Sequence, residues 1–213
     1  MALTSKNLNT GHLQGIMVGE VYSPRGGIAL VTVKVKGDLP KPETKKRKTD
    51  FIQIAAYDDL ADELRQNAVA GQILYARYRL TTGGKKDENG VSQFFNNRTA
   101  DQIVLGPVLG EEKRSVPYLN KGYFQGELAG LKRVYGSDEE LWSLLLSETL
   151  LHDSGREIRH IHRFLLKRDD LKFSVGKKKT GDSVLVQYRV ESRKEEKDGQ
   201  TEHFTDYILT DLI

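Results

Sequence analysis

The sequence contains no cysteine, one tryptophan and five prolines among its 213 residues. Without cysteine, the chain can form neither a disulfide framework nor a thiolate metal site. No stretch approaches the roughly 18 consecutive apolar residues that a membrane-spanning helix requires. The first residues also lack the basic, apolar and small-residue order of a secretory signal. We therefore expect a protein of the cytosol or nucleus that makes no use of a membrane and is stabilised by packing alone.

The charge is modest and unevenly distributed. The formal net charge is +3. Residues 1–110 carry 15 Lys and Arg against 11 Asp and Glu, and the remaining residues carry 18 against 19. The first half is thus the basic half, but ordinary scatter would also explain an excess of this size. The positions of the cations have to decide what they do.

The second half of the chain repeats the first half. Five anchor segments occur in the same order in both halves, at a spacing of 110 or 111 residues for the first three. The pairs are residues 11–15 with 122–126, 58–60 with 169–171, 71–74 with 181–184, 89–90 with 198–199, and 101–103 with 206–208. The repeat predicts two domains of about 100 residues each, a usual size for one small domain.

Each repeat is predicted to consist mainly of strands. Residues 29–36, 50–57 and 73–80 are rich in β-branched and aromatic residues and alternate apolar with polar side chains. Residues 60–69 break this pattern, because Leu60, Leu64 and Val69 share one face of a helix, with Asp58 or Asp59 available as its N-cap. Asn-Gly and Asp-Gly, the favoured hairpin dipeptides, end residues 85–90 and 194–199.

The resulting order in each repeat is three strands, a short helix and two strands, which is the order of the OB fold. We therefore predict an all-β protein with short helices, built as two tandem five-stranded Greek-key barrels. The predicted domains are residues 1–106 and 122–213. Residues 107–121 contain two prolines and a charge cluster and are predicted to be the linker. The alternative is a packed arm that uses Val108, Val116 and Tyr118.

Strand alternation also predicts which side chains of the first barrel point outward. The predicted outer face of three adjacent strands combines aromatic and cationic groups, with the basic segment 41–48 beside it. Unpaired bases stack on aromatic rings, and Lys and Arg neutralise phosphates, so this combination suits single-stranded nucleic acid. The outward side chains are Lys34, Lys36, Phe51, Gln53, Tyr57, Tyr75, Arg77 and Arg79.

Residues 49–80 resemble the bacterial single-stranded DNA-binding protein family. The resemblance lies in an aromatic residue on the third strand, a short helix, and a glycine before a strand that ends in Arg79-Leu80-Thr81-Thr82. It is good for residues 11–105 and fainter for 122–213. It implies that Phe51 and Tyr57 stack on bases, and that basic residues of neighbouring strands contact phosphates. The plan is similar to the two-barrel members of the family, in which two chains form a four-barrel homodimer.

The resemblance and the strand pattern together define the predicted interface and partners. We expect single-stranded DNA as the ligand, with RNA also open, no cofactor, no enzymatic activity, and a bacterial, phage or plasmid origin with a cytoplasmic location. Besides the outward residues above, the candidate nucleic-acid-binding residues are Lys45, Lys46, Arg47, Lys48, Arg163 and Arg189.

The sequence departs from the family pattern in two respects. The family usually carries a long tail with an acidic tip that recruits partners, whereas this sequence stops at residues 207–213. The second repeat also replaces Tyr75 by Leu185 and Arg77 by Gln187, and keeps only Arg189 for Arg79. We therefore expect the first barrel to bind DNA, and the second to bind it partially and to serve assembly.

Other readings of the sequence are weaker. His160 and His162 could share one strand face and bind zinc, but no third ligand follows at a persuasive spacing, so we expect no metal. The aspartate pairs before each predicted helix suit capping better than acid-base chemistry. The functional alternative to a DNA-binding protein is an assembly module of a replication, phage or plasmid complex, in which nucleic-acid affinity is incidental.

Overall fold

The structure is a computed structural model of the whole chain. It describes residues 3–5, 7–24, 26–40, 47–86, 92–109, 116–134, 141–152, 154–197 and 200–213. Among these residues, neither helix has the length and apolar character needed to cross a membrane.

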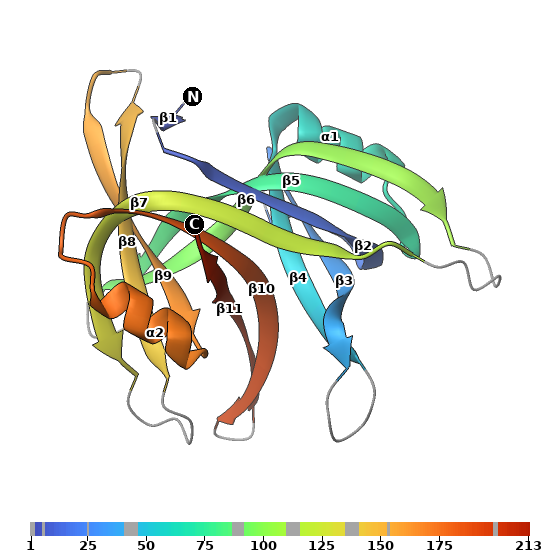
Figure 1. Cartoon of the computed structure of the whole chain (residues 1–213). Coiled ribbons are helices and arrows are strands. Elements are labelled where there is room, and N and C mark those ends of the chain that lie inside the picture. Colours follow the sequence, from blue (N-terminus) through green and yellow to red (C-terminus); the bar gives the residue numbers. More distant parts are fainter. Residues whose placement is uncertain are drawn as a thin grey trace.

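Strands dominate both halves of the chain (Figure 1). The elements of the first half are β1 (Leu3–Ser5), β2 (Asn9–Tyr22), β3 (Ile28–Pro40), β4 (Arg47–Tyr57), α1 (Asp58–Asn67), β5 (Gln72–Lys86) and β6 (Ser92–Val108). Those of the second half are β7 (Leu119–Arg133), β8 (Trp142–His152), β9 (Glu157–Leu166), α2 (Asp169–Gly176), β10 (Ser183–Lys197) and β11 (Gln200–Leu212).

Each half closes into a five-stranded barrel. In barrel 1 the strands pair in the order β2-β3-β4-β6-β5, and β5 returns to pair with β2. In barrel 2 the order is β7-β8-β9-β11-β10, and β10 returns to β7. Each barrel has one parallel contact, at Ala55 and Thr99 in barrel 1 and at Leu165 and Ile208 in barrel 2. The predicted fold, two tandem OB barrels, is confirmed.

The two barrels join through an antiparallel pairing of their first strands, β2 and β7, which Figure 1 shows side by side. Gly11 pairs with Gly122 at the centre of this register, and these two glycines are the first anchors of the repeat. The fully buried rings of Tyr78 and Tyr188 occupy the space where a Cβ of Gly11 or Gly122 would stand. The junction is therefore pseudo-symmetric, with a glycine and a tyrosine from each barrel at its centre.

Two equivalent asparagines fasten the strands on either side of the junction. Asn9 donates to the carbonyl of Leu80 at 2.9 Å and accepts from its N–H at 2.8 Å. Asn120 makes the same two hydrogen bonds with Val190, at 2.6 and 2.9 Å. Each side chain thus completes the backbone bonding of a strand in its own barrel, as buried polar groups require.

The predicted core faces of β3, β4 and β5 are confirmed. Val31, Val33 and Val35 of β3 are buried, and so are the alternate residues of the other two strands. The latter are Ile52, Ile54, Ala56, Leu74, Ala76, Tyr78 and Leu80. Their inward period of two leaves the intervening side chains on the outside of the barrel.

The helix of barrel 1 starts earlier than the sequence predicts. Tyr57 is its N-cap residue and makes no side-chain cap bond, so the predicted capping by Asp58 or Asp59 is wrong. Both aspartates lie in the first turn, where negative charge favours the positive end of the helix dipole. The buried residues are Ala61 and Leu64, whereas Val69 lies beyond the helix and is exposed.

The chain passes from barrel 1 to barrel 2 between the end of β6 at Val108 and the start of β7 at Leu119. Val116 is buried, and Tyr118 packs against the hydrophobic core. Gln14 of β2 donates a hydrogen bond of 2.9 Å to the carbonyl of Pro117. The end of the predicted linker therefore packs against barrel 1, although Val108 is exposed.

Candidate nucleic-acid interface

Strands β3 and β4 of barrel 1 present aromatic and cationic side chains on one outer surface. Lys34 of β3 pairs directly with Phe51 of β4, so the two side chains are neighbours on the same face. Phe51 is 44% exposed and Tyr57, at the end of β4, is 42% exposed. Gln53, between them in the alternation, is exposed as well. We call the surface of Lys34, Phe51, Gln53 and Tyr57 the β3–β4 face.

The predicted cations at the end of this face differ in their availability. Lys36 and Arg47 are exposed, and Lys36 lies 5.8 Å from the centre of the Tyr118 ring. Lys48, by contrast, lies 3.2 Å from a carboxylate oxygen of Asp50 and 3.0 Å from one of Glu191 in barrel 2. The charge of Lys48 therefore serves the contact between barrels. Lys45 and Lys46, also predicted to bind nucleic acid, lie outside the described residues.

The contact between β4 and β10 is centred on Glu191, which is 8% exposed. Arg189, another predicted phosphate contact, donates to Glu191 at 2.9 Å, and Lys167 lies 3.2 Å from the same carboxylate. Burial alone would raise the pKa of Glu191, but the hydrogen bond from Lys48 and the surrounding positive charges lower it to about 2. Glu191 is thus ionised at neutral pH, and its partners Lys48 and Arg189 are committed to it.

The prediction that β5 lies beside β3 and β4 is wrong. In the barrel, β5 pairs with β2 and β6, because α1 carries the chain back to the first strand before β5 begins. Tyr75 and Arg77 therefore lie on another wall of barrel 1. The Tyr75 hydroxyl shares a hydrogen bond of 2.9 Å with Nδ1 of His12, and Arg77 donates to Asp101 at 2.7 Å. Arg79 of the same strand is only partly exposed.

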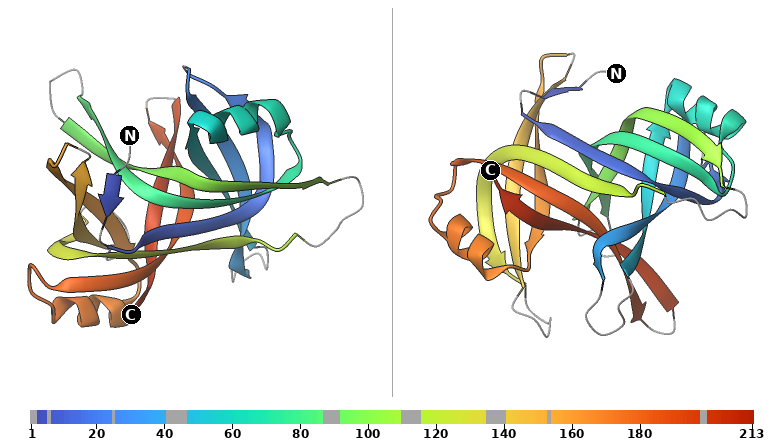
Figure 2. Two further views of the ribbon diagram at one scale, coloured as in Figure 1. Left: turned by 90° about the horizontal axis from the view of Figure 1, so that it is seen from above. Right: turned by 45° about the vertical axis from the view of Figure 1, so that its right-hand side comes forward.

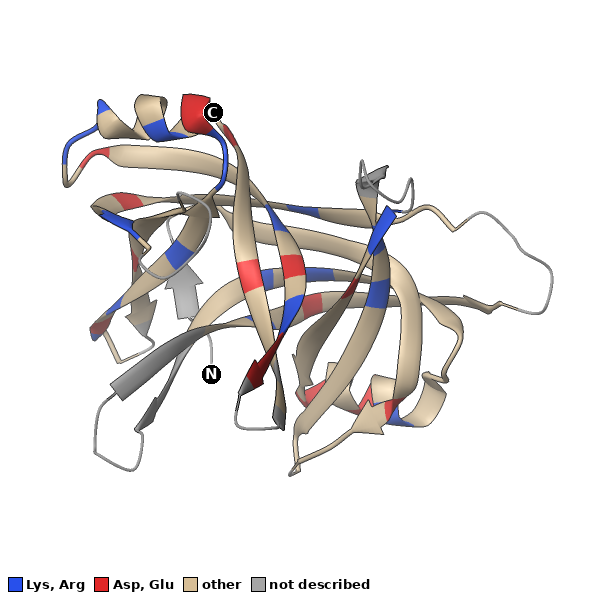
Figure 3. Ribbon diagram, turned by 90° about the horizontal axis from the view of Figure 1, so that it is seen from below, with Lys and Arg blue, Asp and Glu red and all other residues tan. Residues whose placement is uncertain are grey.

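Lys and Arg positions occur on the strands of both barrels, and acidic positions lie beside several of them (Figure 3). Two hairpins bring the barrels' charged groups together: β10 runs beside β4, and β5 beside β9 (Figure 2). Arg98 of β6 is buried where the two barrels meet. It donates to the carbonyl of Gln53 at 2.7 Å and to the Tyr207 hydroxyl of barrel 2 at 2.5 Å.

A cavity of about 840 Å³ lies between the barrels. Its lining combines four arginines with one aspartate, and includes Ile161, Phe204 and Tyr207. The arginines are Arg98 from barrel 1 and Arg159, Arg163 and Arg193 from barrel 2. The charge of Arg193 is largely compensated, because it donates to Asp206 at 2.7 Å and forms an ion pair with Glu195. Its guanidinium also lies 4.6 Å from the centre of the Phe204 ring. The predicted residue Arg163 is exposed on β9 and lines this cavity.

The cavity lies beside β9, the strand of barrel 2 that corresponds to β4 of the β3–β4 face in barrel 1. The parallel contacts at Ala55 and Leu165 align β4 with β9 at a spacing of 110 residues. Ile161 is therefore the counterpart of Phe51, and Arg163 is the counterpart of Gln53. Ile161 is 48% exposed, close to the 44% of Phe51. The two barrels thus offer different chemistry at equivalent positions.

Several residues of these contacts are absent from the sequence prediction. Arg159 and Ile161 alternate on β9 with the predicted residue Arg163, so strand parity alone could have placed all three on one face. Arg98 and Tyr207 had no such signal, because their partners lie more than 100 residues away. Burial raises the pKa of Tyr207, while Arg98 opposes that rise, so the pair is a neutral phenol bound to a guanidinium.

A group of potential metal ligands lies at the contact between the two barrels. Glu148 of β8 pairs in register with His160 of β9, and His162 follows on the same face. The sequence prediction found no third ligand because Glu148 comes from a neighbouring strand. Burial, together with the nearby charges of His162 and Arg79, lowers the pKa of His160, and Glu148 opposes this shift.

Comparisons with known proteins identify the fold. No family model matches the sequence, and no curated protein matches it. Among solved structures, the single-stranded DNA-binding protein of Thermus aquaticus is similar over 98% of this chain and 93% of its own, with 17% identity and a TM-score of 0.65. A deletion mutant of the same protein covers 97% of this chain and 94% of its own, also with 17% identity and a TM-score of 0.65. The likeness shows a shared two-barrel fold over nearly the whole length of both chains.

Proposed function

We propose that this protein binds single-stranded DNA without regard to sequence, as a binding protein of DNA replication, recombination or repair and not as an enzyme. The observation that carries the proposal is the β3–β4 face, where two exposed aromatic rings lie on one strand and Lys34 stands directly beside one of them. Rings of this kind stack on any base, and a neighbouring ammonium group neutralises a phosphate. The similar fold of the Thermus aquaticus single-stranded DNA-binding protein supports the same function.

The bound DNA strand follows a path over the protein that differs from the path predicted from the sequence. The β3–β4 face supplies stacking, and the arginine-lined cavity supplies positive charge on the adjoining barrel. The wall of β5 contributes less, because Arg77 is paired with Asp101 and Tyr75 is bonded to His12. We therefore assign base contacts mainly to Phe51 and Tyr57, and phosphate contacts to Lys34, Lys36, Arg47 and Arg163.

The test is the affinity of the full chain for fluorescein-labelled oligo-dT, measured by anisotropy at low and moderate salt. The double variant Phe51→Ala/Tyr57→Ala is expected to bind at least about 30-fold more weakly, since each stacked base contributes about 1–3 kcal/mol. Phe173→Ala is the matched control, because Phe173 is 67% exposed on α2 and lies far from the β3–β4 face in the fold.

Three outcomes distinguish the alternatives. Loss of affinity in the double variant but not in the control supports the proposal. Equal affinity of wild type and double variant rejects the assigned face. No binding of oligo-dT by the wild type at low salt rejects the function and favours an assembly module. A parallel titration with oligo-rU decides between DNA and RNA, because stacking by itself does not read the 2′-hydroxyl.

We also propose that two chains form a homodimer with four barrels. The outer side of the joined strands β5, β2, β7 and β10 carries Leu119, which is 37% exposed, and the partly exposed Leu185. Apolar residues on a continuous outer sheet suit an interface better than a phosphate path. Analytical ultracentrifugation is expected to give twice the chain mass for the wild type and a monomer for Leu185→Glu. A monomeric wild type would refute the dimer and leave the DNA-binding proposal standing.

A further inference from the structure

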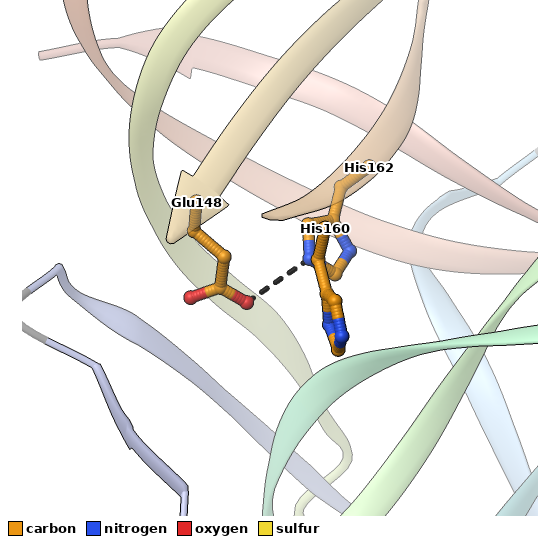
Figure 4. A group of neighbouring side chains, drawn as sticks. All are labelled: Glu148, His160 and His162. Atoms are coloured by element: carbon orange, nitrogen blue, oxygen red, sulfur yellow. Dashed lines mark hydrogen bonds and ion pairs between the residues drawn. The ribbon is translucent and has the colours of Figure 1, made fainter. Parts of the chain in front are cut away.

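Three potential metal ligands converge where β8 and β9 of barrel 2 meet barrel 1 (Figure 4). One ligand atom from each of Glu148, His160 and His162 lies within 4.8 Å of the other two. Nε2 of His162 is 3.0 Å from a carboxylate oxygen of Glu148, and both side chains are fully buried. His160 is partly exposed and lines the cavity between the barrels. The group is thus closed to solvent at Glu148 and His162, and it is accessible from the cavity at His160.

Each ring nitrogen of His162 faces an oxygen atom, and a neutral ring cannot donate a hydrogen bond to both. Its Nδ1 lies 3.2 Å from the side-chain oxygen of Asn96, and its Nε2 lies 3.0 Å from the oxygen of Glu148. A neutral imidazole has a single N–H. If Nδ1 donates to Asn96, the lone pair of Nε2 faces a carboxylate. A second proton or a metal ion then has to lie between them.

The surroundings favour a metal ion. Metal-binding histidines usually donate their other N–H to an oxygen, and the side-chain oxygen of Asn96, 3.2 Å from Nδ1 of His162, is placed to accept such a bond. Asn9 of barrel 1 donates to the same Glu148 oxygen at 2.8 Å and orients the carboxylate. In the part of the chain that the structure describes, Nδ1 of His160 is buried and makes no hydrogen bond. A buried imidazole nitrogen without a partner is uncommon and suits a ligand.

We propose that Glu148, His160 and His162 form a binding site for a divalent transition-metal ion at the contact between the two barrels. Two imidazoles and one carboxylate are a known ligand set for zinc that leaves a fourth position open, and the His160 side chain lines the cavity between the barrels. Ligand atoms about 2.0–2.2 Å from zinc lie roughly 3–3.5 Å apart, so His160 moves inward by about 1 Å on binding. The site does not depend on nucleic-acid binding.

The ion would hold Glu148 and His162 in the orientation in which they contact barrel 1. Glu148 and His162 belong to barrel 2, and their bonding partners Asn9 and Asn96 belong to barrel 1. An ion that binds only the folded chain stabilises it in proportion to the logarithm of its concentration. Zinc should therefore raise the unfolding temperature of the full chain.

The experiment uses the full chain after treatment with EDTA and gel filtration. Isothermal titration with ZnCl2 and metal analysis after desalting are expected to give one Zn²⁺ per chain, and titration with MgCl2 is expected to give no binding. His160→Ala is expected to weaken zinc binding by at least about 10–100-fold. His203→Ala is the matched control, because His203 lines the same cavity outside the group. Co²⁺ should give a visible absorption band that His160→Ala loses.

Glu148→Gln provides a second variant that keeps the size of the side chain and its hydrogen bond from Asn9. The unfolding temperature of each variant in EDTA shows whether the fold is intact. Zinc binding by wild type and His203→Ala, but not by His160→Ala or Glu148→Gln, supports the site. If the wild type retains no zinc, or if both variants retain it as the wild type does, the proposal is wrong and the buried pair holds a proton instead.

Discussion

The outer surfaces next to β4 in barrel 1 and next to β9 in barrel 2 occupy equivalent places but differ in chemistry. Barrel 1 presents Phe51 and Gln53, and barrel 2 presents Ile161 and Arg163. The first pair offers a stacking ring, and the second offers an aliphatic side chain beside a cation. The core positions between them follow the same alternation, with Ile52 and His162 both buried. The two strands therefore share the alternation of buried and exposed positions and differ in the side chains that occupy them.

The comparison also shows what the two barrels share. Both place a glycine of the first strand under a buried tyrosine, and both use an asparagine to complete a neighbouring strand. These features lie at the β2–β7 junction, where the barrels contact each other.

Gly11→Ala and Gly122→Ala are expected to cause the largest losses of folding stability. The added Cβ would overlap the ring of Tyr78 or Tyr188, and overpacking of a buried site costs about 1–3 kcal/mol. Urea unfolding should show similar losses for both variants. Gly26→Ala is the control, because its Cβ would meet open space. A loss in only one of the two variants would show that the junction is not energetically symmetric.

Glu191→Gln should remove about 2 kcal/mol of stability at pH 7. The pKa of Glu191 falls from its ordinary value of 4.5 to about 2 on folding, and solvent screening reduces the corresponding free energy to this size. A depressed carboxyl pKa stabilises the folded chain above pH 4.5, and this contribution disappears as the pH falls from 4.5 to about 2. Unfolding of wild type and variant at pH 7 and pH 2 measures it.

The matched control for this variant is Glu196→Gln, because Glu196 is exposed on the same strand. It should change stability little at either pH. If wild type and Glu191→Gln differ as much at pH 2 as at pH 7, the ion pairs of Glu191 with Lys48 and Lys167 are not the source of the stability.

Single substitutions of the equivalent surface residues sharpen the comparison between barrels. Phe51→Ala should weaken binding of oligo-dT by about 5–160-fold, because it removes a stacking ring that contributes about 1–3 kcal/mol. Ile161→Ala should weaken it less than about 3-fold, because an aliphatic side chain supplies only contact area. Anisotropy titrations of the two variants under identical salt give the ratio. Equal losses would mean that both barrels bind bases alike.

The smallest expected effect is on the salt dependence of binding. Lys34→Ala and Arg163→Ala should each reduce the slope of log K against log salt by about 0.7, the value for one phosphate contact in a single strand. Lys178→Ala is the control, because Lys178 is exposed in the turn after α2. An unchanged slope for Arg163→Ala would remove the cavity from the DNA path and leave barrel 1 as the sole binding unit.

The local sequence pattern determined most of the fold and part of the candidate site. The repeat, the strand and helix order, and the inward residues of β3, β4 and β5 all follow from the sequence, because strand alternation and helix spacing are properties of neighbouring residues. The exposure of Phe51 and Tyr57 follows for the same reason. These features need no knowledge of which strands pair.

Tertiary structure decided which of these residues meet. Barrel closure places β5 beside β2, so Tyr75 and Arg77 do not lie on the face of β3 and β4 that the sequence predicted for them. The contact between β4 and β10 pairs Lys48 with Glu191, and the contact of β8 and β9 with barrel 1 joins Glu148 to His162 and Asn9. Partners of this kind lie on different strands or in different barrels, and strand order and register, which no local period encodes, bring them together.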